Sequence, residues 1–161
     1  MNAPLQVILG DITRIPADAI VNAANTTLLG GGGVDGAIHR AAGPELLEEC
    51  RALKGCKTGE AKITKGYRLP ARYGGAEARG KATCCGAAIK TASASRKEYR
   101  CRTVAFPSIS TGVYRYPLEQ AAEVAVSAIN SFFERKTGIE EVVIVCFDAR
   151  TQKAYLQAVR Q

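Results

Sequence analysis

The sequence predicts an α/β fold, a three-layer α/β/α sandwich around a mixed central sheet, in one domain over residues 1–161. Short apolar runs of strand length alternate along the chain with longer segments of helical periodicity. Most of these runs are apolar throughout, which is typical of strands that helices cover on both faces. The chain shows no internal repeat and no linker, and its length suits a single core.

In the first half of the chain, residues 4–10 predict a strand closed by glycine, and residues 19–25 predict a second, buried strand. A helix is expected from about Asp35, and another is opened by Pro44, because proline suits the first turn of a helix. Residues 59–67 alternate like an edge strand, and their lysines would discourage pairing with the edge of another sheet.

In the second half, residues 103–107 predict a buried strand that ends at a loop. Pro117 opens a long helix that ends before Gly138, a natural helix stop. This helix carries one apolar stripe, made of Leu118, Ala121, Ala122, Ala125, Ile129, Phe132 and Phe133. Residues 142–147 predict a further apolar strand, and residues 151–159 a last helix.

Composition narrows the class of protein. No run approaches the roughly 20 apolar residues of a membrane helix, and the N-terminus lacks the basic region of a signal peptide. We therefore expect a cytoplasmic protein whose six cysteines are reduced thiols. The single histidine, His39, excludes a multi-histidine metal site, and Cys84-Cys85 lacks the spacing of a zinc site. We expect neither a metal nor a cofactor.

The net charge of +7 is unevenly distributed. Residues 74–100 hold six basic and two acidic residues, so they carry more than half of it. A nucleic-acid binder would need a contiguous basic face with stacking aromatic side chains, and only 6% of the residues are aromatic, none of them Trp. We keep that class as an alternative but expect no nucleic-acid partner.

A glycine-rich loop follows the second predicted strand. The four glycines at 30–33 leave backbone N–H groups free to face inward, and the helix that begins just after them adds the positive end of its dipole. This pattern predicts a phosphate cradle, with a flexible turn as the other interpretation. The loop is neither a Walker A motif nor a dinucleotide-binding G-x-G-x-x-G.

A second loop rich in hydrogen-bond donors, Ser110–Tyr114, follows the strand at 103–107. Ligands of open α/β sheets bind at the carboxyl ends of the strands, so two such loops could hold both phosphates of a diphosphate. They would do so without a lysine and without Mg²⁺. This favours a nucleotide-diphosphate sugar over phosphoryl transfer, which normally needs the metal.

Four motifs occur in a fixed order: Gly10-Asp11-Ile12-Thr13, Val21-Asn22-Ala23-Ala24-Asn25, Gly30 to His39, and Ser110-Thr111-Gly112-Val113-Tyr114. Together they resemble the macrodomain family, and more closely its MacroD-type branch of O-acetyl-ADP-ribose deacetylases and mono-ADP-ribosyl hydrolases. The resemblance covers about residues 4–73 and 100–160. It implies a three-layer α/β/α fold that binds ADP-ribose in a cleft across the strand ends.

The resemblance also implies which residues bind the ligand. Asp11 would accept a hydrogen bond from the adenine amino group, with Ile12 beside it, and Phe147 would pack against the adenosine portion. The first phosphate loop would be Gly32, Gly33 and Val34. The second phosphate loop would be Ser110, Thr111, Gly112, Val113 and Tyr114.

Asn25 and Asp35 match the polar pair that faces the distal ribose, and they are the predicted catalytic residues. A carboxylate near a helix start is favoured by the helix dipole and can accept a proton from a ribose hydroxyl or a water. The Asn25 amide can fix that ribose. Asn22 and His39 are interpreted as structural residues, with a ligand contact and a general-base role as the respective alternatives.

The expected reaction is hydrolysis of an ester on the distal ribose, with a water oriented by Asp35 and a ligand phosphate. The ester would be O-acetyl-ADP-ribose or ADP-ribose on an acidic protein side chain. The implied partners are ADP-ribose, its esters and mono-ADP-ribosylated proteins, bound by a monomer. A non-catalytic ADP-ribose-binding module and a destabilised, inactive product are the alternatives.

Residues 74–100 depart from the family's pattern, which has an apolar strand and then a leucine-rich helix there. Only Ile89 and Tyr99 are large apolar residues in this segment. We therefore expect one strand to be missing or replaced at 74–100, through a deletion with an out-of-frame reading of the gene or through a lineage-specific insertion. The predicted edge strand at 59–67 would then lose its neighbour in the sheet.

Overall fold

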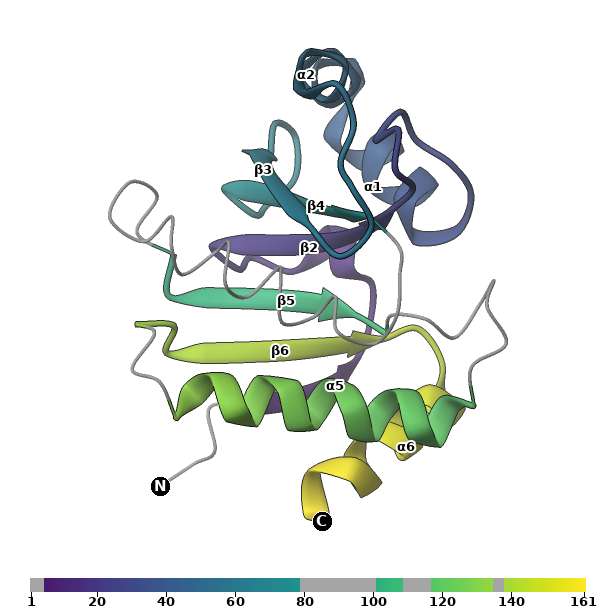
Figure 1. The fold of residues 1–161 in the computed structure, drawn as a ribbon, viewed down its shortest axis with the longest axis vertical. Coiled ribbons are helices and arrows are strands. Elements are labelled where there is room, and N and C mark those ends of the chain that lie inside the picture. Colours follow the sequence, from purple (N-terminus) through teal and green to yellow (C-terminus); the bar gives the residue numbers. More distant parts are fainter. Residues whose placement is uncertain (1–4, 79–100, 109–116, 135–137) are drawn as a thin grey trace.

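The computed structural model describes residues 5–78, 101–108, 117–134 and 138–161. Its six strands form one sheet in the order β1-β6-β5-β2-β4-β3 (Figure 1). The strands are β1 (Leu5–Leu9), β2 (Ala19–Ala24), β3 (Ala61–Lys65), β4 (Tyr73–Ala78), β5 (Thr103–Pro107) and β6 (Glu141–Cys146). All neighbouring pairs are parallel except β3 with β4, so the sheet is mixed and β3 is an antiparallel edge strand.

The helices pack on both faces of this sheet. They are the short 3-10 helix η1 (Ile12–Arg14), α1 (Gly33–Ala42), α2 (Pro44–Leu53), α5 (Leu118–Phe133) and α6 (Ala149–Arg160). The predicted fold class is confirmed. The predicted elements lie within about two residues of the observed ones, except that α5 ends at Phe133, several residues before the expected stop at Gly138. The strand predicted at 59–67 is an edge strand, as expected.

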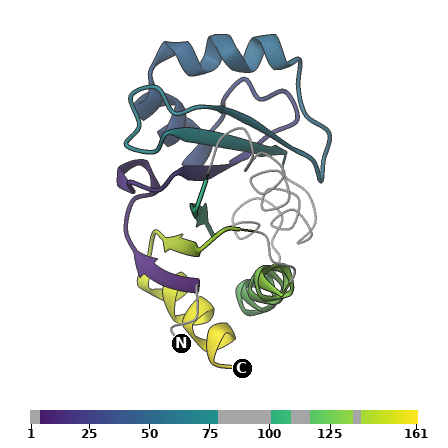
Figure 2. The same cartoon turned by 90° about the vertical axis from the view of Figure 1, so that its left-hand side faces the viewer.

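Two hydrophobic cores lie on opposite faces of the sheet, as the alternation along β6 shows. Val142 and Ile144 belong to a core that α5 and α6 cover, whereas Val143 and Val145 face the core of α1 and α2. Figure 2 shows α5 nearly end-on beside the sheet. The predicted apolar stripe of this helix is confirmed, because Ala122, Ala125, Ile129 and Phe132 are buried in the first core and Ala121 is buried as well.

The expectation of a missing strand is wrong. β4 spans Tyr73–Ala78 and pairs along its whole length with β2, and over residues 73–77 with β3 on its other side. Backbone hydrogen bonds hold this strand, and they do not depend on side-chain size. Small residues even suit the position, since a Cβ added to Gly74 would lie 3.0 Å from Oγ1 of Thr64. Residues 79–100 lie outside the described part of the chain.

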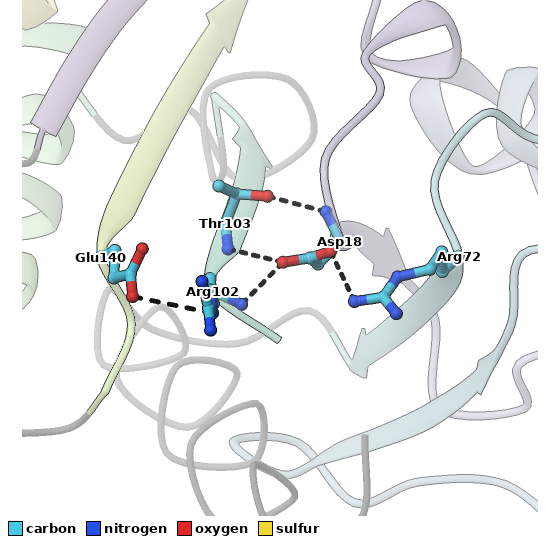
Figure 3. Close-up of polar contacts among 5 residues, drawn as sticks. All are labelled: Asp18, Arg72, Arg102, Thr103 and Glu140. Atoms are coloured by element: carbon cyan, nitrogen blue, oxygen red, sulfur yellow. Dashed lines mark hydrogen bonds and ion pairs between the residues drawn. The ribbon is translucent and has the colours of Figure 1, made fainter. Parts of the chain in front are cut away.

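One carboxylate joins the strands at their amino ends, opposite the edge that carries the predicted ligand loops (Figure 3). Oδ2 of Asp18 accepts hydrogen bonds from the backbone N–H groups of Arg102 (2.7 Å) and Thr103 (3.1 Å), and Oδ1 accepts one from Arg72 (2.6 Å). The Asp18 backbone N–H donates in return to Oγ1 of Thr103 at 2.8 Å. This network links the start of β2 to the start of β5 and to the segment before β4.

Within the described ranges, no helix has both the length and the apolar character needed to cross a lipid bilayer.

Candidate functional site

A cavity of about 400 Å³ lies at the carboxyl ends of β1, β5 and β6, beside the start of α1. Its volume is in the range of small-molecule sites. The described residues that line it come from the loops after these strands and from one face of α1: Gly10, Asp11, Ile12, Gly33, Val34, Ala37, Arg40, Pro107, Ser108, Val145 and Phe147.

The structure brings many of the predicted ligand-binding residues together in this cavity. Five of them line it: Asp11, Ile12, Gly33, Val34 and Phe147. Gly32 does not line it but directly precedes α1 as its N-cap residue. The second predicted phosphate loop, Ser110–Tyr114, lies outside the described residues.

Asp11 is held as a hydrogen-bond acceptor on the cavity wall. Its Oδ1 accepts from the backbone N–H of Thr13 (2.9 Å) and from the Thr13 hydroxyl (2.7 Å), because Asp11 caps η1. These two hydrogen bonds lower the pKa of Asp11. The side chain is 51% exposed, so the carboxylate remains accessible to an N–H group of a ligand.

Phe147 places an aromatic ring in water at the edge of the cavity. It follows β6 directly and is 87% exposed, the largest exposed fraction among the exposed large hydrophobic residues. An exposed aromatic side chain beside a cavity is typical of a surface that a ligand covers.

The glycine run approaches the helix that follows it very closely. Gly30 and Gly33 have positive φ angles of 89° and 62°, which favour glycine. A Cβ added to Gly36 would lie 2.5 Å from the backbone oxygen of Gly31, so α1 can begin here only because Gly36 has no side chain. No side chain of a described residue caps the N-terminus of α1, which leaves its first N–H groups open to an anionic ligand.

Asp35 is buried in the first turn of α1, with 1% of its surface exposed. Its Oδ1 accepts a hydrogen bond from Nδ2 of Asn22 at 2.8 Å, and Nε2 of His39 lies 3.5 Å from the same oxygen. No hydrogen bond from a described residue reaches Oδ2 of Asp35. The two contacts on Oδ1 therefore orient the carboxylate and leave its second oxygen available.

Sequence reasoning missed the connection of Asn22 and His39 to Asp35. The spacing of Asp35 and His39, four residues apart on one helix, was a signal that their side chains share a face. Asn22 could not be found this way, because it lies on β2 and reaches Asp35 only when the strand packs against α1. Its Oδ1 is buried and has no partner among the described residues.

Asn25 and Asp35 lie on two sides of Gly31. A Cβ added to Gly31 would be 3.6 Å from Nδ2 of Asn25 and 3.2 Å from Oδ2 of Asp35. Because Gly31 carries no side chain, the Asn25 amide nitrogen and the Asp35 carboxylate oxygen both approach the same side of this residue, and we call the space beside it the gap at Gly31. A hydroxyl or a water suits this gap, because it can accept from the amide and donate to the carboxylate. Neither Asn25 nor Asp35 lines the larger cavity described above.

Arg40 is a second residue that sequence reasoning missed. It lies three residues after Ala37 on the helix face that lines the cavity, and it is the one cation among the described lining residues. Its Nη1 reaches back along α1, to 3.1 Å from the position of a Cβ on Gly36. The side chain places positive charge beside the open N-terminus of the helix.

Other kinds of site find no support in the described ranges of the chain. They contain no group of three His, Cys, Asp or Glu side chains that could hold a metal ion. Burial raises the pKa of the Cys50 and Cys146 thiols to about 11, so neither supplies a thiolate nucleophile at neutral pH.

The sequence is similar to proteins of one family. A family profile described as Macro domain matches residues 21–125. A Macro domain-containing protein of Chlorobaculum tepidum is 53% identical over 98% of this chain and 96% of the relative. The ADP-ribose glycohydrolase MACROD1 of Bos taurus is 47% identical over 96% of this chain and 51% of the relative.

Solved structures resemble the fold closely. The Oceanobacillus iheyensis macrodomain with ADP has a TM-score of 0.89 and 37% identity, covering 97% of this chain and 90% of the other. The Trypanosoma brucei macrodomain in complex with ADP-ribose has a TM-score of 0.87 and 40% identity, covering 96% of this chain and 68% of the other.

Proposed function

Because the chain belongs to the Macro domain family, we propose that it binds ADP-ribose and hydrolyses an ester on the distal ribose of that ligand. The observation that carries the binding proposal is the cavity of about 400 Å³ that five predicted ligand-binding residues line. The solved relatives from Oceanobacillus iheyensis and Trypanosoma brucei contain ADP and ADP-ribose, and the relative from Bos taurus is named an ADP-ribose glycohydrolase.

The chemistry of the cavity wall supports one orientation of the ligand. Adenine lies at Asp11 and Ile12, where the carboxylate accepts from the exocyclic amino group, and Phe147 covers the adenosine portion. The diphosphate lies at the N-terminus of α1, against the backbone N–H groups of Gly33 and Val34. The distal ribose then points to the gap at Gly31. The role of Ser110–Tyr114 as second phosphate loop stays a prediction.

The arrangement around Asp35 supports hydrolysis by an oriented water. Oδ2 of Asp35 accepts a hydrogen bond from the water, and the water oxygen attacks the carbonyl carbon of the ester. The bond between that carbon and the ribose oxygen breaks. The water proton passes through Asp35 to the departing ribose oxygen, so the products are ADP-ribose and a free carboxylic acid. Asn22 and His39 hold Oδ1 and so keep Oδ2 directed at the gap.

Calorimetric titration with ADP-ribose and an assay of ester hydrolysis test this proposal together. The two substrates are O-acetyl-ADP-ribose and a protein ADP-ribosylated on glutamate. Asp35→Asn keeps the shape of the side chain, and we expect it to bind ADP-ribose while hydrolysis falls by about 100-fold or more. Glu48→Gln is the matched control, because that carboxylate lies on α2, is 71% exposed and, among the described residues, pairs only with Arg51.

Two results would overturn the proposal in different ways. If Asp35→Asn binds ADP-ribose normally and retains full hydrolysis, the Asp35 carboxylate is not catalytic. If the wild-type protein has no affinity for ADP-ribose, ADP-ribose is not its ligand.

A non-catalytic ADP-ribose-binding module is the second candidate. It is favoured by the burial of Asp35, which is 1% exposed and does not line the cavity. Tight binding of ADP-ribose by the wild-type protein, without release of acid from either ester, would establish this candidate over the hydrolase.

A further inference from the structure

The turn that follows β2 holds the side chain of Asn25 in one orientation. We infer that Thr27 is a positioning residue, whose hydroxyl keeps the N–H side of the Asn25 amide toward the gap at Gly31. This inference rests on the proposed function, in which that gap takes the distal ribose.

The hydrogen bonds of the Thr27 hydroxyl determine its role. Its Oγ1 lies 2.7 Å from Oδ1 of Asn25 and accepts the backbone N–H of Leu29 at 3.3 Å. A hydroxyl has a single proton, and the oxygen already receives the Leu29 N–H. The Thr27 proton therefore goes to Asn25, and the atom of the amide that faces Thr27 is the acceptor Oδ1.

The hydrogen bond made by the amide nitrogen of Asn25 supports this assignment. Nδ2 of Asn25 donates to the backbone oxygen of Gly30 at 3.1 Å, where an oxygen would be repelled. An amide nitrogen carries two protons, so one N–H remains for a ligand. Nδ2 lies 3.6 Å from the position of a Cβ on Gly31, which places this remaining donor at the gap.

The backbone of the turn is held by contacts that do not involve the Thr27 hydroxyl. The N–H of Leu28 donates to the carbonyl of Asn25 at 3.2 Å, and the N–H of Cys56 donates to the carbonyl of Thr26 at 2.8 Å. Leu28 has a φ of 61° and is fully buried, so its side chain anchors the turn in the core of α1 and α2. Thr27 itself is exposed. Removing its hydroxyl therefore frees the Asn25 amide without releasing the loop.

The consequence concerns only ligands that reach the gap. With the amide held, a ribose hydroxyl accepts from Asn25 and donates to Oδ2 of Asp35. Without the Thr27 hydroxyl, the amide also populates the flipped orientation, in which two oxygens face the ribose hydroxyl from both sides. ADP lacks the distal ribose, so its affinity does not depend on this orientation.

The experiment compares calorimetric titrations of ADP-ribose and ADP for three variants. Thr27→Val removes the hydroxyl with little change of shape, and we expect ADP-ribose affinity to fall about three- to tenfold while ADP affinity is unchanged. Thr27→Ser retains the hydroxyl and is expected to keep both affinities. Thr26→Val is the matched control, since its hydroxyl lies on the same exposed turn and makes no hydrogen bond with the described residues.

A second readout needs no ligand. The side-chain amide resonances of Asn25 are recorded by NMR in the free protein, and Thr27→Val is expected to shift them while Thr26→Val leaves them in place. Unshifted Asn25 resonances in Thr27→Val would overturn the inference. So would unchanged ADP-ribose affinity, or an equal loss for ADP and ADP-ribose. Failure of the proposed function is distinct: the wild type would then bind neither ligand, while the Asn25 resonances still shift.

Discussion

Replacing Asp18 by asparagine is expected to destabilise the fold, although this residue lies far from the cavity. The substitution keeps the shape of the side chain but removes the negative charge that three donors share. Oδ2 accepts the backbone N–H groups of Arg102 and Thr103 at 2.7 and 3.1 Å, and Oδ1 accepts from Arg72 at 2.6 Å (Figure 3). If the amide oxygen of asparagine takes the place of Oδ2, it can still accept both backbone N–H groups, but its NH₂ group then faces the Arg72 guanidinium, which loses its acceptor.

The magnitude follows from these contacts. A hydrogen bond to a charged group contributes about 1.5–3 kcal/mol. The Asp18 side chain is 22% exposed, so water partly screens its charge. This favours the loss of one such hydrogen bond, at the lower end of that range. We therefore expect Asp18→Asn to lower the free energy of unfolding by about 2 kcal/mol. For a chain of this size, that corresponds to a decrease of about 4–8 °C in Tm.

The effect should depend on pH. Burial by itself would raise the pKa of Asp18, but the hydrogen bonds from Arg102, Thr103 and Arg72 outweigh it and hold the pKa below its ordinary value of 3.8. Between the two pKa values the folded state binds fewer protons than the unfolded state, so stability rises with pH there. The contribution of Asp18 to the free energy of unfolding is thus complete at pH values above the ordinary pKa, and it is lost as the pH falls through the lower pKa of the folded state.

Urea unfolding followed by circular dichroism, at pH 7 and at pH 3, measures this difference between wild type and Asp18→Asn. Glu140→Gln is the control, because Glu140 pairs with Arg102 at 3.7 Å but both side chains are more than 60% exposed, and its effect should stay within about 0.5 kcal/mol. Equal stability of wild type and Asp18→Asn at pH 7 would refute the reasoning. So would a difference that stays the same size at pH 3.

Three further substitutions test the site. Gly36→Ala should lower Tm in thermal melts, because its Cβ would lie 2.5 Å from the backbone oxygen of Gly31 and such overpacking costs about 1–3 kcal/mol. Gly32→Ala should leave Tm unchanged, since no atom of the described residues lies within 4 Å of its Cβ position. Phe147→Ala should weaken ADP and ADP-ribose equally in calorimetry without a change in Tm, since the ring is 87% exposed. Gly31→Ala should fill the gap beside Asp35 and weaken ADP-ribose more than ADP; equal losses would contradict that placement.

The prediction of the fold succeeded where local patterns carry the information and failed at one strand. The apolar period of α5 and the apolar run of β6 are readable from a few consecutive residues, because burial on a known face requires them. β4 lacks that signal, since it begins with Tyr73-Gly74-Gly75 and is held by backbone hydrogen bonds from β2 and β3. Such bonds leave no trace in the side chains of the strand itself.

The residues of the candidate site likewise fall into those that the sequence indicated and those that only the tertiary structure brings together. The resemblance to macrodomains implied that Asp11, Gly33 and Phe147 contact one ligand, and the structure places all three at one cavity, because loops after parallel strands meet at one edge of a sheet. The hydrogen bond between Asn22 and Asp35, by contrast, joins the middle of a strand to a helix. No spacing rule relates those two residues, and their contact exists only when β2 and α1 pack face to face.

Local composition therefore placed the elements, the glycine run and the loops predicted to contact the ligand, since hydrophobic period and backbone freedom act within a few residues of each position. Packing between distant segments decided the rest: the orientation of the Asp35 carboxylate, the gap at Gly31 and the pairing that forms β4. These features depend on distances of about 3 Å between atoms that the chain order does not bring together.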